Sequence, residues 1–553
     1  MEAVSRASNE GEALYYLGLA RAGLGQAQEA RFAWDQAAAV PGWRAPSLLQ
    51  LGRLAARVGD PEEGLHLLQQ ALAASPEMIR AGGMEVALLR HTGRLAEARK
   101  RLRYWTAIDA PNSFLRHEAV LLGAPDDALW AHLASDPERV LELAVDYMAV
   151  GLWRDAQALL ARRYPATGVH GEAGTVLPQD YPLVAYYRGY CAEKDGGSGR
   201  EDFALASRQS TRYVFPNRAE SFPVLQKALE VNPQDATAHF LLGSLHLSGG
   251  NTDEALAEWG KARSLDPKLP VLHRNIGLAL LYSRAAAEEA LGAFREGMAA
   301  DPTNVELYEG ADQAMSLLGR GPEERIATLR RYPGPPPTRI LLKLALALGE
   351  AERFEEAEAL FPGHFFPREE FGTNVRQVYL EVKLRQAFAL ARAGRKAEAA
   401  ALASAFGAVV PGLDFTKDGM AAFQEAPRFQ YYSGELQALL GNEAAAREQW
   451  TRAAAGRDFR QAAFAHRAAQ RLGAANEAEW RPRLEAALAE ADLYLFRGGH
   501  YPAVATAARG LILRALRRGR EGDEALRQVF LLPDKGMPHH IARLALSGGR
   551  MEE

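Results

Sequence analysis

The sequence predicts an all-α fold, a solenoid of stacked helix pairs, and three observations lead to this prediction. Gly243 and Gly277 lie 34 positions apart, and the residues around both follow one pattern. Small residues recur where two helices must approach closely. A proline follows the last turn of each unit, where it ends the helix. A period of about 34 residues is typical of arrays in which each helix pair contacts only its neighbours.

The stretch 235–267 is the clearest single unit. Gly243 lies in its predicted first helix, Ala255 and Trp259 lie in its second, and Pro267 ends it. Gly243 and Ala255 let the two backbones approach, and Trp259 fills the space between this pair and the next. The same pattern places Gly277 opposite Phe294, Gly18 opposite Trp34, Gly52 opposite Leu68 and Gly434 opposite Trp450.

Changes in register divide the chain into five expected regions. They are N-terminal repeats at 1–111, degenerate helical repeats at 112–233 with an inserted loop at 194–217, regular repeats at 234–333, irregular repeats at 338–456, and a C-terminal helical capping region at 457–553. We expect the last region to cover the final exposed face of the stack, as terminal repeats do.

The inserted loop at 194–217 begins with a polar, glycine-rich stretch and continues with several aromatic residues. We expect it to fold back and place Tyr213 and Phe215 against the helix that carries Tyr186 and Tyr190, where they would narrow a groove. The alternative is that these rings cover the outer edge of the solenoid, which is common for loops.

The composition excludes several classes of protein. With 65 basic and 69 acidic residues, the net charge of −4 does not indicate a nucleic acid or an anionic membrane as partner. The single cysteine, Cys191, excludes an internal disulfide framework and is consistent with a reducing compartment. No apolar stretch has the length of a membrane helix, and no signal peptide is recognisable at the start. We therefore expect a cytoplasmic protein.

The sequence contains no motif that indicates catalysis, a metal or a cofactor. The patterns for phosphate loops, zinc proteases and serine hydrolases are missing. His539 and His540 are adjacent and point about 100° apart on a helix, so we interpret them as solvated side chains rather than metal ligands. Cys191 follows Gly189 closely and is expected to be a small buried residue, since no histidine is placed locally to activate it.

The order of a large residue, Leu, Gly, Ala, Phe, Ala and Pro in these units resembles the tetratricopeptide repeat consensus. That resemblance implies a right-handed superhelix. The irregular segments PNSFLRHEAVLL at 111–122, ERVLELAVDYMAVGLWRDAQALL at 138–160 and REEFGTNVRQVYLEVKLRQAFALARAG at 368–394 resemble the repeat tail of a bacterial family of uncharacterised proteins. Members of that family carry an N-terminal β-sandwich similar to galactose mutarotase. Here helical repeats begin within the first fifteen residues, so we expect this domain to be missing.

The resemblance also implies a binding groove, because the first helix of each tetratricopeptide pair lines the concave face. By this resemblance, the residues three positions before and one position after the glycine of each first helix face the groove. They include Tyr15, Tyr186, Tyr190, Phe240, Arg274, Tyr431 and Glu435. Tyrosine and arginine supply much of the binding energy at interfaces. The alternative is that the aromatic residues pack between helix pairs. A second candidate surface is the connection 364–371, which is rich in aromatic and charged residues.

These features favour a non-catalytic scaffold that binds a peptide or protein partner in its concave groove. The alternative hypothesis is an accessory role in carbohydrate metabolism, in which the chain docks a mutarotase-like β domain or binds a sugar directly. The first hypothesis depends on the repeat register, and the second depends on the resemblance to the bacterial tail.

Overall fold

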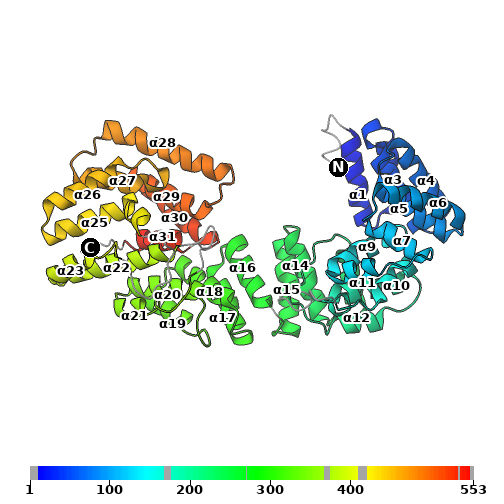
Figure 1. Cartoon of the computed structure of the whole chain (residues 1–553), viewed down its shortest axis with the longest axis horizontal. Coiled ribbons are helices and arrows are strands. Elements are labelled where there is room, and N and C mark those ends of the chain that lie inside the picture. The colour runs from blue at the N-terminus through cyan, green and yellow to red at the C-terminus, as the bar shows by residue number, and fades with distance from the viewer. Residues whose placement is uncertain are drawn as a thin grey trace. The chain divides into compact units, whose positions relative to one another are not determined.

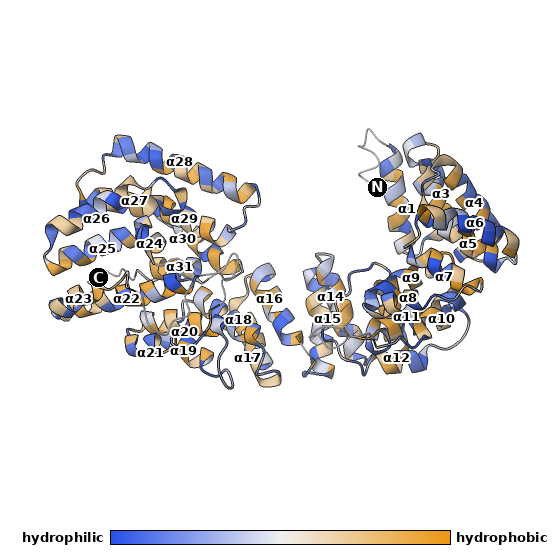
Figure 2. Ribbon diagram, in the orientation of Figure 1, coloured by the Kyte–Doolittle hydropathy of each residue, from blue (hydrophilic) through white to orange (hydrophobic). Residues whose placement is uncertain are grey.

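The computed structural model describes residues 10–166, 176–269, 271–366, 374–408, 420–533 and 536–548, and all regular elements within these ranges are helices (Figure 1). The predicted all-α fold of helix pairs is therefore confirmed. Figure 2 shows apolar and polar residues interleaved along the helices of both ends of the chain, as expected for helices that bury one stripe. Within the described ranges, no helix has both the length and the apolar character needed to span a membrane.

The chain divides into two compact units, Met1–Leu272 and His273–Glu553. The first unit contains mostly successive antiparallel pairs. Its helices are α1 (Glu10–Gly23), α2 (Ala27–Ala38), η1 (Pro41–Trp43), α3 (Arg44–Arg57), α4 (Pro61–Ala74), α5 (Ile79–His91), α6 (Leu95–Ile108), α7 (Ser113–Leu121), α8 (Asp127–Ala134), α9 (Pro137–Ala149), α10 (Trp153–Ala161), η2 (Pro178–Asp180), α11 (Pro182–Lys194), α12 (Arg200–Ala206), α13 (Ser221–Val231), α14 (Ala236–Ser248) and α15 (Thr252–Leu265).

The second unit starts within α16 and continues the pairing. Its helices are α16 (Leu272–Arg284), α17 (Ala287–Ala300), α18 (Val305–Leu317), α19 (Pro322–Leu329), α20 (Thr338–Glu350), α21 (Phe354–Glu358), α22 (Val375–Arg392), α23 (Lys396–Ser404), α24 (Ala421–Gln424), α25 (Pro427–Leu440), α26 (Glu443–Ala455), η3 (Phe459–Gln461), α27 (Ala462–Arg471), α28 (Glu477–Phe496), α29 (Pro502–Ala515), α30 (Gly519–Gln528), η4 (Val529–Leu531) and α31 (Met537–Ser547).

Glycines of the first helices meet large side chains of the second helices, as the repeat pattern predicts. A Cβ atom placed on Gly243 would lie 2.6 Å from Cδ1 of Trp259, and one on Gly277 would lie 2.4 Å from Cε1 of Phe294. The indole nitrogen of Trp259 also donates to the Phe240 carbonyl at 3.0 Å. The predicted partners of Gly18, Gly52 and Gly434 meet their glycines in the same way. Close approach at these glycines therefore fixes how the two helices of a pair meet.

The insertion at 194–217 differs from its prediction in two respects. It contains the short helix α12, whose Phe203 packs on Gly189, so α12 is the second helix of that pair. Tyr213 and Phe215 are 52% and 68% exposed, so they do not pack against α11 as expected. Phe203 already occupies the space beside Tyr186, at 6.4 Å between ring centroids.

Contacts between helices distant in sequence modify the expectation that each pair touches only its neighbours. In the first unit α3 contacts α9, and a Cβ on Gly151 would lie 2.9 Å from the Cα of Arg57. In the second unit α31 does not merely cover the last pair. It reaches back to α18, α20 and α22, the first helices of three earlier pairs.

Candidate functional site

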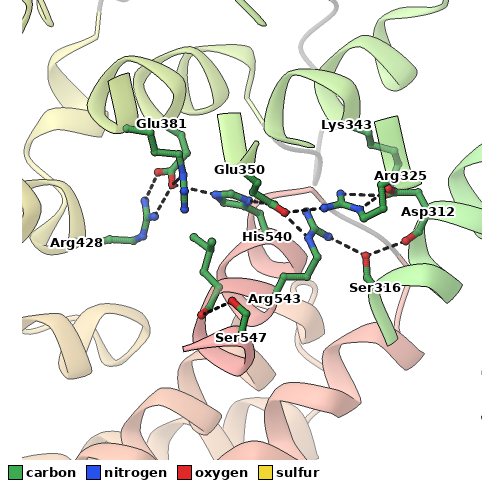
Figure 3. Close-up of polar contacts among 12 residues, drawn as sticks. Asp312, Ser316, Arg325, Lys343, Glu350, Glu381, Arg428, His540, Arg543 and Ser547 are labelled. Carbon is green, nitrogen blue, oxygen red and sulfur yellow. Dashed lines mark hydrogen bonds and ion pairs between the residues drawn. The ribbon is translucent and has the colours of Figure 1, made fainter. Parts of the chain in front are cut away.

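Helix α31 lies on a buried cluster of charged side chains in the second unit, which we name the α31 charge cluster (Figure 3). Three carboxylates, those of Asp312, Glu350 and Glu381, form ion pairs in it. Their cationic partners among the described residues are Arg325, Lys343, Arg385, Arg428, His540 and Arg543. Six cations thus share three carboxylates, so the interior of this unit carries excess positive charge although the whole chain is weakly acidic.

The part of the cluster nearest α18 is formed by neighbouring helices. Arg325 on α19 is 0% exposed. Its Nε donates to Asp312 at 2.7 Å, and its Nη1 donates to Glu350 at 2.8 Å. The ammonium of Lys343 lies 3.7 Å from Asp312. Burial alone would raise the pKa of the Asp312 carboxyl, but Arg325 and Lys343 outweigh it and lower that pKa.

His540 joins α31 to two of these carboxylates. The ring is 0% exposed, with Nδ1 2.7 Å from Glu350 and Nε2 2.9 Å from Glu381. Each ring nitrogen thus lies within hydrogen-bond distance of a carboxylate, and an ionised carboxylate only accepts hydrogen bonds. Glu381 also accepts two hydrogen bonds from Arg428, at 2.8 and 3.0 Å. His540 therefore bridges α20 and α22 from a helix about 160 residues later.

The carboxylates of this bridge remain ionised although they are buried. Burial would raise the pKa of the Glu381 carboxyl, but Arg428 and His540 outweigh it and hold that pKa well below the usual range. Glu350 behaves in the same way, with Arg325 and Arg543 as the main opposing charges. A buried ion network of this kind is costly to break, because removal of one member leaves an uncompensated charge.

The main chain before α31 is also bound by side chains of the earlier helices. The amide nitrogen of Gln313 on α18 donates to the carbonyls of Phe530 and Leu532, both at 2.7 Å. Arg543 donates from Nη1 to the hydroxyl of Ser316 at 3.2 Å and from Nε to Glu350 at 3.3 Å. We call Gln313, Ser316, Glu350 and Glu381 the inner face of the second unit, because α31 and its preceding turn rest on them.

Two pockets flank α31, and Leu544 contributes to both. The first has a volume of about 630 Å³ and includes Arg385, whose Nη2 atom is buried without a hydrogen-bond partner among the described residues. Glu350 and Glu352 also line this pocket. The second has a volume of about 510 Å³ and is lined by arginines with no carboxylate. Helix α31 therefore forms one wall of each of these two arginine-rich pockets.

The first unit buries a different cluster. Arg90 donates to Glu118 at 2.8 and 3.0 Å and to Asp155 at 2.9 Å. The hydroxyl of Tyr147 donates to Glu118 at 2.8 Å and lies 2.7 Å from Nδ1 of His117. These residues come from α5, α7, α9 and α10, which are close together in the sequence. This cluster therefore holds neighbouring repeats together without help from distant segments.

The predicted groove residues of the first unit fall into two groups. Tyr186 and Phe240 are fully buried, and the hydroxyl of Tyr186 donates to Asp235 at 2.9 Å. Tyr15 and Tyr190 are half-buried. The hydroxyl of Tyr15 accepts a hydrogen bond from Gln50 at 3.2 Å. Tyr186 and Phe240 therefore pack between helices. A role in binding for any of these four residues stays a prediction.

The three predicted residues of the second unit are engaged in internal contacts. Arg274 forms an ion pair with Glu306 at 2.6 Å. Tyr431 is buried, 5.1 Å from the ring of its neighbour Tyr432. Glu435 is buried and accepts from Nε of Arg471 at 2.7 Å. The seven residues are distributed over both units. Their role in binding a partner also stays a prediction.

Two further interpretations from the sequence can be compared with the structure. The interpretation of His539 and His540 as solvated is wrong, because both are buried. Cys191 is buried as expected, and burial raises the pKa of its thiol to about 12. Of the candidate surface 364–371, residues 367–371 lie outside the described residues, and Phe365 is exposed.

The inner face of the second unit was not predicted from the sequence. Gln313, Glu350, Glu381 and Arg543 form their contacts across 159 to 227 positions of sequence, and no repeat spacing connects them. The available signal was weaker: Lys343 is a charged residue in the middle of an apolar stretch of its helix. Charged residues in such places are seldom buried without a partner.

Comparisons with known proteins agree with the repeat pattern. The tetratricopeptide repeat family matches residues 49–113 and 217–270. Human and mouse tetratricopeptide repeat protein 28 are 32% and 31% identical over 116 residues, which are 21% of this chain. The chain spans only 5% of the length of these relatives.

Solved structures with similar chains also contain these repeats. One is the tetratricopeptide domain of P58(IPK), at 15% identity with a TM-score of 0.21, covering 84% of this chain and 98% of that one. Another is yeast Tom70, at 13% identity with a TM-score of 0.24, covering 97% and 95%.

Proposed function

We propose that this chain is a non-catalytic interaction scaffold that binds a peptide or protein partner in the concave groove lined by the first helices of its pairs. One observation carries the proposal. The inner face of the second unit already holds polypeptide of the chain itself, namely residues 529–533 and 536–547. A surface that binds a helix and its preceding turn within the chain has the chemistry to bind one from a partner.

The contacts with this internal segment indicate what such a partner would present. The side chain of Gln313 donates hydrogen bonds to main-chain carbonyls, which every peptide contains. Glu350 and Glu381 hold His540, and Glu350 also holds Arg543. Paired carboxylates on an inner face favour a helix with cationic side chains one turn apart, as in helix-in-groove recognition. A partner at this face therefore competes with α31.

The experiment measures binding of a labelled synthetic peptide of residues 529–548 to the full-length chain. In the wild type the internal segment occupies the inner face, so binding should be weak. The double variant His540→Ala/Arg543→Ala loosens the internal segment, and its affinity for the peptide should rise at least about tenfold by removal of this competition. Adding Gln313→Ala to that variant should lower the affinity again.

The matched control is His500→Ala/Arg520→Ala, which changes the same residue types outside the inner face. It should bind the peptide as weakly as the wild type. Failure of a folded His540→Ala/Arg543→Ala chain to bind the peptide would contradict recognition by the inner face.

The carbohydrate-related alternative stays a prediction that rests on the resemblance to the bacterial repeat tail. Calorimetry with mono- and oligosaccharides tests direct sugar binding, and co-purification with a mutarotase-like domain tests docking. Saturable heat with one sugar would favour this alternative over the scaffold.

A further inference from the structure

The arginine-lined pocket beside α31 has an unusual charge composition. It encloses about 510 Å³ between α25, α27, α29 and α31. Its charged and aromatic lining consists mainly of Arg428, Arg467, Arg514, Arg517, His466 and Tyr432. None of its lining residues is an aspartate or a glutamate. Four guanidinium groups thus surround one small cavity.

Only two of these arginines have a carboxylate partner. Arg428 is bound to Glu381, and Arg514 is bound to Asp523 at 2.6 Å. Arg467 and Arg517 form no ion pair with any residue in the described part of the chain. The pocket therefore contains two guanidinium groups without a direct carboxylate partner, although, after the hydrogen bond and charge of Arg481, the charge of Arg517 also acts on Glu477 and lowers the pKa of that carboxyl.

Aromatic packing holds part of this charge in place. The guanidinium carbons of Arg428 and Arg467 lie 5.9 and 5.4 Å from the ring centre of Phe464. Arg428 also lies 5.3 Å from the ring of Tyr432. Two cations stacked on one ring repel each other unless an anion lies between or beside them. Burial and the charge of Arg467 lower the pKa of His466, which favours the neutral form of this ring.

A phosphate group matches these features. The planar fork of arginine binds phosphate oxygens through two parallel hydrogen bonds, and several such forks are typical of phosphate sites. A phosphate group carries close to two negative charges at neutral pH, so it can pair with both guanidinium groups that lack a direct carboxylate partner. The cavity is also large enough for a phosphate ester of a small organic group.

We propose that this pocket binds a phosphate group, either as free phosphate or as a phosphate monoester. Because Ile541, Leu544 and Ala545 form one wall, the pocket is complete only while α31 is seated. Phosphate binding therefore also stabilises the seated position of α31 by linkage. This inference goes beyond the proposed scaffold function and does not depend on it.

The test is isothermal titration calorimetry of the full-length chain with inorganic phosphate and with phenyl phosphate, in a chloride buffer. One saturable site per chain is expected. The double variant Arg467→Gln/Arg517→Gln removes the two guanidinium groups that lack a direct carboxylate partner, and it should weaken the affinity at least tenfold. Tighter binding of phenyl phosphate assigns the site to an ester, and equal binding assigns it to free phosphate.

The matched control is Arg452→Gln/Arg520→Gln, which makes the same change in net charge at exposed positions outside the pocket. Its affinity should stay within twofold of the wild type. Arg517→Gln alone serves as a second variant, since Arg517 is exposed and its loss leaves the fold intact; it should weaken binding about threefold. Absence of saturable binding in the wild type, or an equal loss in the control, overturns the proposal.

Discussion

Each unit buries a cluster of charged side chains, and the two clusters differ in the sequence distance that they bridge. In the cluster of the first unit the longest link, from Arg90 to Asp155, spans 65 positions. In the second unit Arg543 reaches Ser316 across 227 positions. The cluster of the first unit therefore joins repeats that are close in sequence, although α3 and α9 of this unit also contact each other. In the second unit, the C-terminal helix couples repeats that would otherwise be independent.

The largest effect is expected from Glu381→Ala. This carboxylate accepts from His540 and Arg428, and its loss leaves buried cations without a partner. Breaking a buried network in this way costs about 3–5 kcal/mol. Urea unfolding followed by hydrogen exchange should show the loss in the second unit, including α31, with the first unit unchanged.

The control for that variant is Glu398→Ala, which removes an exposed carboxylate paired only with Arg395 nearby. Exposed pairs contribute about 0–1 kcal/mol, so this change should be small. Equal destabilisation by both substitutions would mean that the α31 charge cluster does not couple the second unit.

Acidification should weaken the first unit before the second. Burial lowers the pKa of His117 to about 4, whereas an unfolded histidine titrates near 6.5. The neutral ring is thus favoured in the folded state, and its stability contribution is complete above about pH 6.5 and is lost as the pH falls toward 4, by up to about 3 kcal/mol. The lowered pKa values of Glu350 and Glu381 keep the second cluster ionised over this range.

Hydrogen exchange of α7 and α9 between pH 7 and pH 4.5, corrected for the intrinsic exchange rate, measures this effect. The substitution His117→Gln should flatten the pH dependence in these helices. A dependence that is unchanged in the variant would show that another group controls the acid response.

A smaller and strictly local effect is expected from Gly243→Val. An added Cβ would lie 2.6 Å from Trp259 and 2.9 Å from the carbonyl oxygen of Ala255, so the α14–α15 pair must separate. Overpacking of this kind costs about 1–3 kcal/mol. Exchange should accelerate in α14 and α15 and not in α31. Gly260→Val on α15 is the matched control, because its Cβ meets no atom within 4 Å and should change stability little.

The sequence predicts the elements that obey local rules. The pairing of Gly243 with Trp259, and of Gly277 with Phe294, follows from a 34-residue period together with the need for close helix contact. The all-α fold follows from the same pattern. Tyr186 and Phe240 are buried, and their sequence spacing alone did not distinguish a buried ring from a groove ring.

The candidate site was not predictable in the same way. His540 contacts Glu350 and Glu381 because the chain folds back over about 160 to 190 positions, and such a return has no periodic signature. The position of Tyr213 and Phe215 was mispredicted for a related reason. Phe203 fills the space beside α11 instead. The sequence does not show which of several aromatic residues packs there.

Hydrogen exchange of α31 in the unmodified full-length chain tests the central claim most directly. The buried His540, the ion pairs to Glu350 and Glu381 and the hydrogen bonds from Gln313 predict that amides 541–547 are protected to a degree comparable with those of α22. Exchange of these amides at the rate of an unstructured peptide, while α22 remains protected, would contradict the claim that the C-terminal helix occupies the inner face of the second unit.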